Sequence, residues 1–155
     1  MKKKITAIVL AAGSGRRMGG DIPKQYMELS GKPVIYYSLK VFQDSVVDDI
    51  VLVVSDEYIE YCRKEIVERY GFSKVTDIIS GGRERYDSVR NGLEACESAD
   101  YVLIHDGARP LITGGMVKRS IATLEEETGC SVAVKLWMWY FYRKLGKKIK
   151  MIQKR

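Results

Sequence analysis

The stretch ITAIVLAAGSGRRMGGDIPKQY, residues 5–26, joins an apolar run to a cationic, glycine-rich segment. Residues 5–10 are mostly apolar and predict a strand buried inside a sheet. The glycines that follow allow backbone conformations and close approaches that side chains would forbid. Arg16, Arg17 and Lys24 add positive charge, and such cations around a nest of backbone N–H groups suit a triphosphate. A solvated surface loop is the alternative interpretation.

The rest of the chain alternates β-branched runs with helical patterns. Strands are expected at residues 50–54, 74–79, 101–105 and 130–134, and helices at residues 34–42, 59–70, 87–96 and 116–124. This alternation implies parallel pairing with right-handed crossovers. We therefore predict an α/β fold with a doubly wound, mostly parallel, Rossmann-like sheet that is incomplete at its C-terminus. Asp87 or Ser88 is expected to cap the third helix.

Composition points to one cytoplasmic domain. The chain has 155 residues, and none of its apolar runs approaches the ~20 residues of a membrane span. Three cysteines without a CxxC spacing predict reduced thiols packed in the core. The basic, apolar N-terminus resembles a secretory signal, but its apolar part is short, so a buried strand is favoured.

The net charge of +6 comes from the end of the chain. Residues 135–155 hold eight basic residues and no acidic ones, whereas the remainder holds 18 basic and 20 acidic residues. The body is therefore not a basic nucleic-acid-binding domain. Ligands of a doubly wound sheet bind beyond the carboxyl ends of its strands, so the loops after residues 10, 79 and 105 are the candidates for a site.

Those three loops carry motifs that resemble a known family. LAAGSGRRMG followed by PKQY is similar to the signature of sugar nucleotidyltransferases. SGGRERYDSV at residues 80–89 and HDGARP at residues 105–110 narrow the resemblance to the 2-C-methyl-D-erythritol 4-phosphate cytidylyltransferases, over residues ~5–135. Such an enzyme transfers a cytidylyl group from CTP to that sugar-alcohol phosphate, in isoprenoid precursor synthesis by the non-mevalonate pathway. A ribitol-5-phosphate or other sugar-phosphate cytidylyltransferase is the alternative.

The resemblance implies roles for individual residues. Arg17 and Lys24 would be catalytic, because they would hold the triphosphate and stabilise charge on its α-phosphate. Asp106 and Arg109 would bind the acceptor, and Asp106 would also hold Mg²⁺ or the ribose. His105, the single histidine, is expected to be structural. The nucleotide-binding positions would be Ala11, Ala12, Gly13, Ser14, Gly15, Gly81, Gly82, Arg83, Arg85 and Ser88.

The resemblance stops after Lys135, which divides the chain into a nucleotidyltransferase domain, residues 1–135, and a basic aromatic tail, residues 136–155. Members of the family are longer and add a dimer arm and late acceptor-binding residues. The tail is interpreted as a truncated or frame-shifted end, as a non-catalytic segment binding anionic membrane or nucleic acid, or as a final strand and helix. We expect weak CTP–Mg²⁺ binding and reduced turnover. The resemblance also implies the homodimer of the family, although the arm that interlocks that dimer is absent from this sequence.

Overall fold

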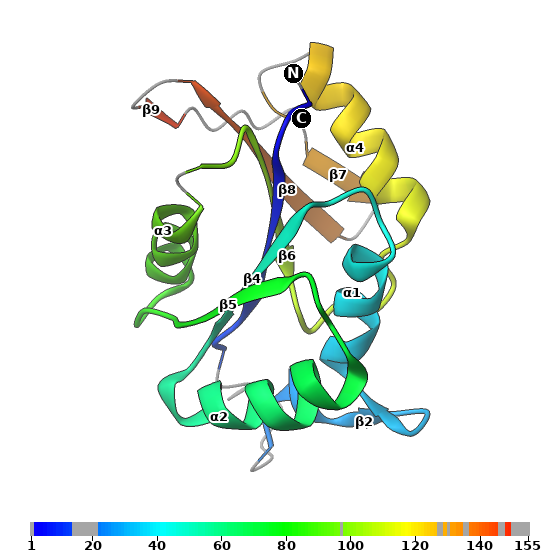
Figure 1. Cartoon of the computed structure of the whole chain (residues 1–155), viewed down its shortest axis with the longest axis vertical. Helices are drawn as coiled ribbons and strands as arrows, with labels where there is room; N and C mark the ends of the chain where they lie inside the picture. The colour runs from blue at the N-terminus through cyan, green and yellow to red at the C-terminus, as the bar shows by residue number, and fades with distance from the viewer. Residues whose placement is uncertain are drawn as a thin grey trace.

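The computed structural model describes residues 2–13, 22–96, 98–126, 129, 131–134, 137–145 and 148–149. A central sheet has the strand order β5-β4-β1-β6-β8-β7, with β9 paired to β8 (Figure 1). Its strands are β1 (Ile5–Ala11), β4 (Asp49–Val54), β5 (Val75–Ser80), β6 (Tyr101–Asp106), β7 (Ser131–Val134), β8 (Trp137–Leu145) and β9 (Lys148–Ile149).

Four strands pair in parallel, as the alternation of strands and helices predicts. β4 and β6 flank β1 on its two sides, so that Ala7 lies opposite Ile50 on one side and Leu103 on the other. The chain first builds outward from β1 to β4 and β5, and then crosses to the other side of β1 to form β6. The strand order therefore reverses between β1 and β6, where doubly wound sheets bind their ligands.

Helices cover both faces of the sheet, which confirms the doubly wound prediction. α1 (Val34–Gln43) and α4 (Gly114–Glu126) lie on one side of it and α3 (Arg85–Ala95) on the other (Figure 1). The remaining elements are η2 (Lys24–Tyr26), the β2 (Glu28–Leu29) and β3 (Lys32–Pro33) hairpin, η3 (Asp56–Tyr58), and α2 (Ile59–Tyr61), which continues as the π-helix η4 (Cys62–Glu68).

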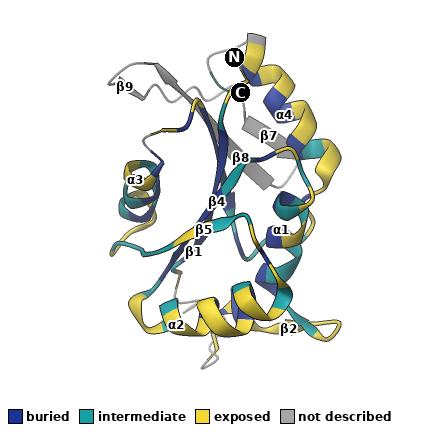
Figure 2. Ribbon diagram, in the orientation of Figure 1, coloured by how far each residue is buried: buried dark blue, intermediate teal, exposed yellow. Residues whose placement is uncertain are grey.

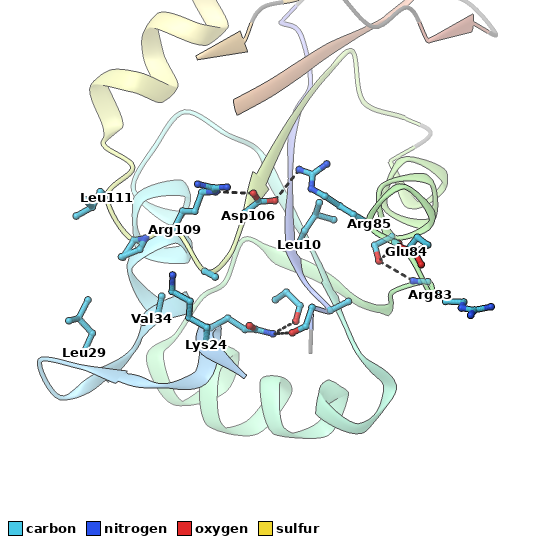
Figure 3. A pocket seen from close by; sticks show the side chains of 18 of the residues that line it. Leu10, Lys24, Leu29, Val34, Arg83, Glu84, Arg85, Asp106, Arg109 and Leu111 are labelled. Atoms are coloured by element: carbon cyan, nitrogen blue, oxygen red, sulfur yellow. Dashed lines mark hydrogen bonds and ion pairs between the residues drawn. The ribbon is translucent and has the colours of Figure 1, made fainter. Parts of the chain in front are cut away.

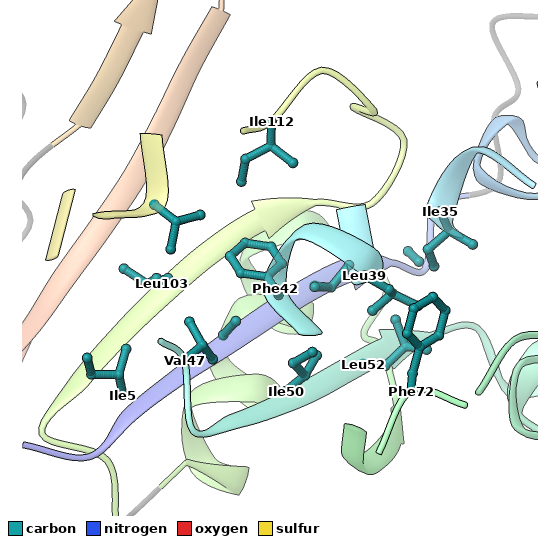
Figure 4. Close-up of a cluster of buried hydrophobic side chains, with 14 of the residues drawn as sticks. Ile5, Ile35, Leu39, Phe42, Val47, Ile50, Leu52, Phe72, Leu103 and Ile112 are labelled. Carbon is teal, nitrogen blue, oxygen red and sulfur yellow. The ribbon is translucent and has the colours of Figure 1, made fainter. Parts of the chain in front are cut away.

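The core follows the two-residue period of β1. Ala7 and Val9 belong to a cluster with Leu39 and Phe42 of α1 (Figure 4). Ile8 belongs to the opposite cluster, against which Val89 and Leu93 of α3 pack. Successive side chains of a strand point to opposite faces, so an entirely apolar strand needs helices on both sides. β1, β4 and β6 are accordingly almost entirely buried, whereas the edge strand β5 is partly exposed, as are the outer faces of the helices (Figure 2).

The start of α3 differs from the prediction. The helix begins at Arg85, and its N-terminal cap is Glu84, whose extended backbone has φ −113° and ψ 165°. Asp87, predicted as one of two possible caps, instead accepts a hydrogen bond from the Glu84 N–H at 3.2 Å. Ser88, the other predicted cap, lies inside the helix. The prediction of the cap was wrong because a capping box places the acidic partner three residues inside the helix.

Part of the basic aromatic tail is a strand. β8 pairs antiparallel with β6 through Tyr101↔Arg143 to Ile104↔Tyr140, and β7 pairs antiparallel with β8. The run of parallel pairing thus ends at β6, and the fifth predicted strand, β7, does not extend it. Residues 135–136, 146–147 and 150–155 of the chain lie outside the described residues.

Two of the cysteines are described, and both fit the prediction of core thiols. Cys62 and Cys96 are buried and form no disulfide, while Cys130 lies outside the described residues. Burial raises the pKa of the Cys62 thiol to about 11, although a contact with the Tyr26 hydroxyl lowers it slightly. Among the described helices, none combines the length and apolar composition needed to cross a bilayer.

Candidate active site

A cavity of about 990 Å³ opens at the carboxyl ends of β1 and β6 (Figure 3). Its lining comes from the three motif-bearing loops, together with Leu29 and Val34 on the η2–α1 side and Leu111 and Met116 beyond β6. Cavities of ~300–1,000 Å³ that are largely apolar with a few convergent polar groups are typical of ligand sites. The volume is at the upper end of that range.

The backbone at the end of β1 is held from two directions. Gly107 N–H donates to the Leu10 carbonyl at 2.7 Å, which ties the loop after β6 to β1. From the other direction, the Gln25 carboxamide donates to the carbonyls of Ala11 at 2.6 Å and Gly13 at 2.9 Å. Sequence reasoning missed Gln25, although it lies in the PKQY motif. The feature of the sequence that could have indicated Gln25 is its place as a polar residue between a lysine and an aromatic residue that is expected to be buried.

Lys24 lies on the short turn η2, beside the cavity. Pro23, Gln25 and Tyr26 around it are buried, whereas Lys24 is exposed and lines the cavity. Figure 3 shows its side chain extending from the turn toward the region where Arg109 lies. A flexible ammonium on an anchored backbone suits contact with a polyanion that enters the cavity.

The loop before α3 packs against the end of β1. A Cβ built on Gly81 would come within 2.4 Å of Ala12 Cβ and 2.8 Å of Ser88 Oγ, and one on Gly82 within 2.1 Å of Asp87 Cβ. Only glycine fits at these close approaches. Ser88 is buried, and its hydroxyl accepts the Gly82 N–H at 3.0 Å. Ser88 therefore braces the loop as well as lining the cavity.

Two arginines converge on Asp106, where β6 ends. Arg85 Nη2 lies 3.0 Å from Asp106 Oδ1, and Arg109 Nε lies 2.9 Å from Oδ2, so each carboxylate oxygen has its own guanidinium (Figure 3). Burial alone would raise the pKa of the Asp106 carboxyl, but the charges and hydrogen bonds of the two arginines outweigh it and hold the pKa below its usual range. The carboxylate thus stays ionised and aligns both cations at the cavity wall.

His105 lies beneath the cavity. It is 1% exposed, and its Nε2 lies 3.0 Å from Ser38 Oγ and 3.2 Å from the Arg109 carbonyl. The ring also meets Phe42 edge-on. These contacts join α1 to the turn that carries Arg109, in keeping with the structural role expected of this histidine.

Most of the predicted site residues meet at this cavity. Gly81 lies behind the lining, against Ala12, and the Arg83 guanidinium points away from the centre of the cavity (Figure 3). Ser14, Gly15 and Arg17 lie outside the described residues. Those that line the cavity are Ala11, Ala12, Gly13, Lys24, Gly82, Arg83, Arg85, Ser88, Asp106 and Arg109.

The surroundings of Asp106 do not fit a resident metal ion. Both of its oxygens are engaged by guanidinium groups, and the described part of the chain contains no cluster of three His, Cys, Asp or Glu residues that could hold a metal. Mg²⁺ requires near-octahedral oxygen coordination, which a single carboxylate between two cations does not provide. A cation in the cavity would need ligands from a bound substrate.

Comparisons with known proteins agree with the three motifs. The profile of the family described as 2-C-methyl-D-erythritol 4-phosphate cytidylyltransferase matches residues 5–137. The protein of that name from Lachnoclostridium phytofermentans is 53% identical over 132 residues, which cover 85% of this chain and 57% of that protein. The chain therefore spans little more than half the length of this relative.

Solved structures share the fold. A crystal structure of 4-diphosphocytidyl-2C-methyl-D-erythritol synthase superposes with a TM-score of 0.68 at 26% identity, covering 92% of this chain and 76% of that chain. Rv0371C from Mycobacterium tuberculosis, solved in complex with manganese, has a TM-score of 0.68 at 16% identity and covers 91% of this chain and 71% of its own. At that identity the second likeness concerns the fold alone.

Proposed function

The chain belongs to the 2-C-methyl-D-erythritol 4-phosphate cytidylyltransferase family, and on that premise we propose that it transfers a cytidylyl group from CTP to 2-C-methyl-D-erythritol 4-phosphate. The products are 4-diphosphocytidyl-2-C-methyl-D-erythritol and pyrophosphate. The observation that carries the proposal is the shared cavity: motifs near residues 11–26, 80–89 and 105–110 all contribute to its lining. An isoprenoid precursor pathway in the cytoplasm is the proposed context.

The reaction needs positioning and charge stabilisation rather than a covalent enzyme intermediate. A phosphate oxygen of the acceptor attacks the α-phosphorus of CTP, and the bond to pyrophosphate breaks as the new P–O bond forms. In the proposal, Lys24 and Arg17 stabilise the negative charge that builds on the α-phosphate. The backbone of residues 11–13 and the loop at Gly81 and Gly82 surround the nucleoside, whose exocyclic amino group donates to backbone carbonyls and distinguishes cytosine from uracil.

Arg109 and Arg85 supply the charge for the acceptor phosphate in this proposal. What supports it is their convergence on Asp106, with Arg85 Nη2 at 3.0 Å and Arg109 Nε at 2.9 Å from its oxygens. A carboxylate that holds two guanidinium groups in place fixes the position of both positive charges at the cavity wall, where an acceptor phosphate would meet them. Asp106 is thus proposed to orient the arginines.

We propose that the divalent cation, Mg²⁺, enters with CTP and is bound by the phosphate oxygens rather than by Asp106. The donor set at Asp106, already engaged by two guanidinium groups, supports this assignment. A cation of this kind offsets the charge of the triphosphate. The domain limits 1–135 and 136–155 and the homodimer stay predictions.

The proposal is tested by CTP binding and pyrophosphate release with the purified 155-residue chain. CTP in Mg²⁺ buffer is expected to bind more tightly than UTP, ATP or GTP, and Lys24→Gln is expected to slow transfer ~100-fold or more. Lys64→Gln is the matched control, since Lys64 is exposed and does not line the cavity. Equal affinity for all four nucleotides would contradict the assignment to CTP.

A second candidate class is a non-catalytic chain that binds anionic surfaces through its tail. The eight basic residues and the absence of acidic residues in residues 135–155 favour it. Retention by anionic vesicles or nucleic acid that falls steeply with salt, and is abolished by deleting residues 136–155, would support this class. Retention that survives the deletion would exclude the tail as the binding segment.

A further inference from the structure

We propose that Gln25 is a positioning residue: its buried carboxamide ties the turn that carries Lys24 to the backbone at the end of β1. The lysine and the nucleotide-binding backbone would then keep one fixed geometry. The role given to Lys24 rests on the proposed function. The connection between η2 and the end of β1 does not, because it consists of contacts within the structure.

The connection consists of two hydrogen bonds from one nitrogen. Gln25 is 4% exposed, and its Nε2 donates to the carbonyl oxygens of Ala11 at 2.6 Å and Gly13 at 2.9 Å. A carboxamide has two N–H donors, and here both are directed at the segment where β1 ends. Gln25 lies 14 positions after Ala11 and 12 positions after Gly13 in the sequence, so both contacts are tertiary rather than local.

Neighbouring contacts make the turn an effective carrier for Lys24. Tyr26 is 7% exposed, stacks on Tyr58 with a ring-centroid distance of 4.4 Å, and has its hydroxyl 3.5 Å from the Ala11 carbonyl. The backbone of the turn is closed by the Tyr26 N–H, which donates to the Pro23 carbonyl at 2.9 Å. Lys24 is exposed between these anchored residues, so the position of its Cα depends on them.

Hydrogen bonding explains why glutamine is needed here and an apolar residue is not sufficient. Tyr26 and Pro23 already bury apolar surface in this turn. The contribution of the carboxamide is therefore its directional hydrogen bonds rather than additional buried apolar area. Without it, the Ala11 and Gly13 carbonyls lose a buried donor and the turn can shift relative to β1. A displacement of ~1 Å in a group that contacts the reacting atoms costs on the order of 100-fold in rate.

A double-mutant cycle separates positioning from a general effect on folding. Gln25→Met keeps the length of the side chain but removes both donors, and Lys24→Met removes the ammonium. Gln25→Met is expected to weaken CTP binding in Mg²⁺ about tenfold in the natural chain, but less than about twofold in the Lys24→Met background. If the two losses are instead additive, Gln25 does not act through Lys24 and the proposal is overturned.

Amide hydrogen exchange tests the connection without any nucleotide. The N–H groups of Tyr26 and Met27 are hydrogen-bonded within the turn, at 2.9 and 3.2 Å, and Gln25→Met is expected to make both exchange about tenfold faster. Unchanged rates would overturn the proposal. A chain that binds no CTP refutes the proposed function alone, and the exchange rates then decide whether Gln25 fixes the turn.

Gln43→Met is the matched control. Gln43 ends α1, and its side chain bonds Ser73 Oγ at 2.9 Å and the Lys74 N–H at 3.0 Å, outside the cavity lining. It is expected to leave CTP binding and exchange in η2 unchanged. If Gln25→Met does not fold, Gln25→Leu, which is also neutral and lacks both donors, takes its place in both measurements and is judged by the same outcomes.

Discussion

Lowering the pH from 7.5 to 5.0 should destabilise the protein through His105. The imidazole is 1% exposed, and its Nε2 is engaged with Ser38 Oγ at 3.0 Å and the Arg109 carbonyl at 3.2 Å. Burial lowers the pKa of His105 to about 3; the Asp106 carboxylate raises it and the Arg109 charge lowers it, both to a smaller extent. The folded protein therefore keeps the ring neutral throughout this pH range.

The unfolded chain behaves differently, because its histidine has a pKa of about 6.5. Above that value the ring is neutral in both states and its contribution to stability is fully present. As the pH falls below it, only the unfolded chain takes up the proton, so the free energy of unfolding decreases by ~1.4 kcal/mol per pH unit until the pH approaches the folded pKa of about 3. Between pH 6.5 and 5.0 the loss is about 2 kcal/mol.

Urea unfolding at pH 7.5 and 5.0, followed by circular dichroism, measures this loss. His105→Gln is the informative variant because glutamine can still donate a hydrogen bond but does not titrate, and because the chain has a single histidine. Between these two pH values, the decrease in the free energy of unfolding should be about 2 kcal/mol smaller for His105→Gln than for the natural chain. An equal pH dependence in both chains, or a folded-state histidine that titrates near pH 6 by NMR, would refute the reasoning.

Three further changes test the site and the core. Asp106→Asn removes the carboxylate that aligns Arg85 and Arg109, and urea unfolding at pH 7 should show a loss of ~2 kcal/mol; an unchanged midpoint would mean that the ion pairs add nothing. Gly82→Ala forces a Cβ to within 2.1 Å of a neighbouring Cβ and should cost ~1–3 kcal/mol in the same assay, whereas Gly114→Ala, with no atom within 4 Å, should change stability by less than ~0.5 kcal/mol. Leu39→Ala in the fully buried part of α1 should lower stability by ~2–5 kcal/mol in thermal unfolding, and a loss below ~1 kcal/mol would contradict its place in the core.

Local patterns were sufficient for the fold class. The apolar run of β1 and the alternation of strands and helices indicate a sheet that is covered on both faces, and the order β5-β4-β1-β6 confirms it. The clustering of the motifs also follows from this order. Because β1, β5 and β6 are parallel, their carboxyl ends lie at the same edge of the sheet, and the three motif-bearing loops begin there. The cap of α3 was mispredicted because a capping box uses Glu84 and Asp87 together, and either one alone looks like an ordinary acidic residue.

Periodicity and composition are local properties of the chain, and they were enough to predict the buried strands β1, β4 and β6, the edge of the sheet that bears the motifs and the charged residues there. Which polar groups meet could be learned from the folded structure alone: Gln25 contacts Ala11, Arg85 contacts Asp106 and His105 contacts Ser38, at separations of 14, 21 and 67 residues. These contacts depend on how η2, α3 and α1 pack against β1 and β6. That packing is set by side-chain volumes across the whole core, which no local pattern contains.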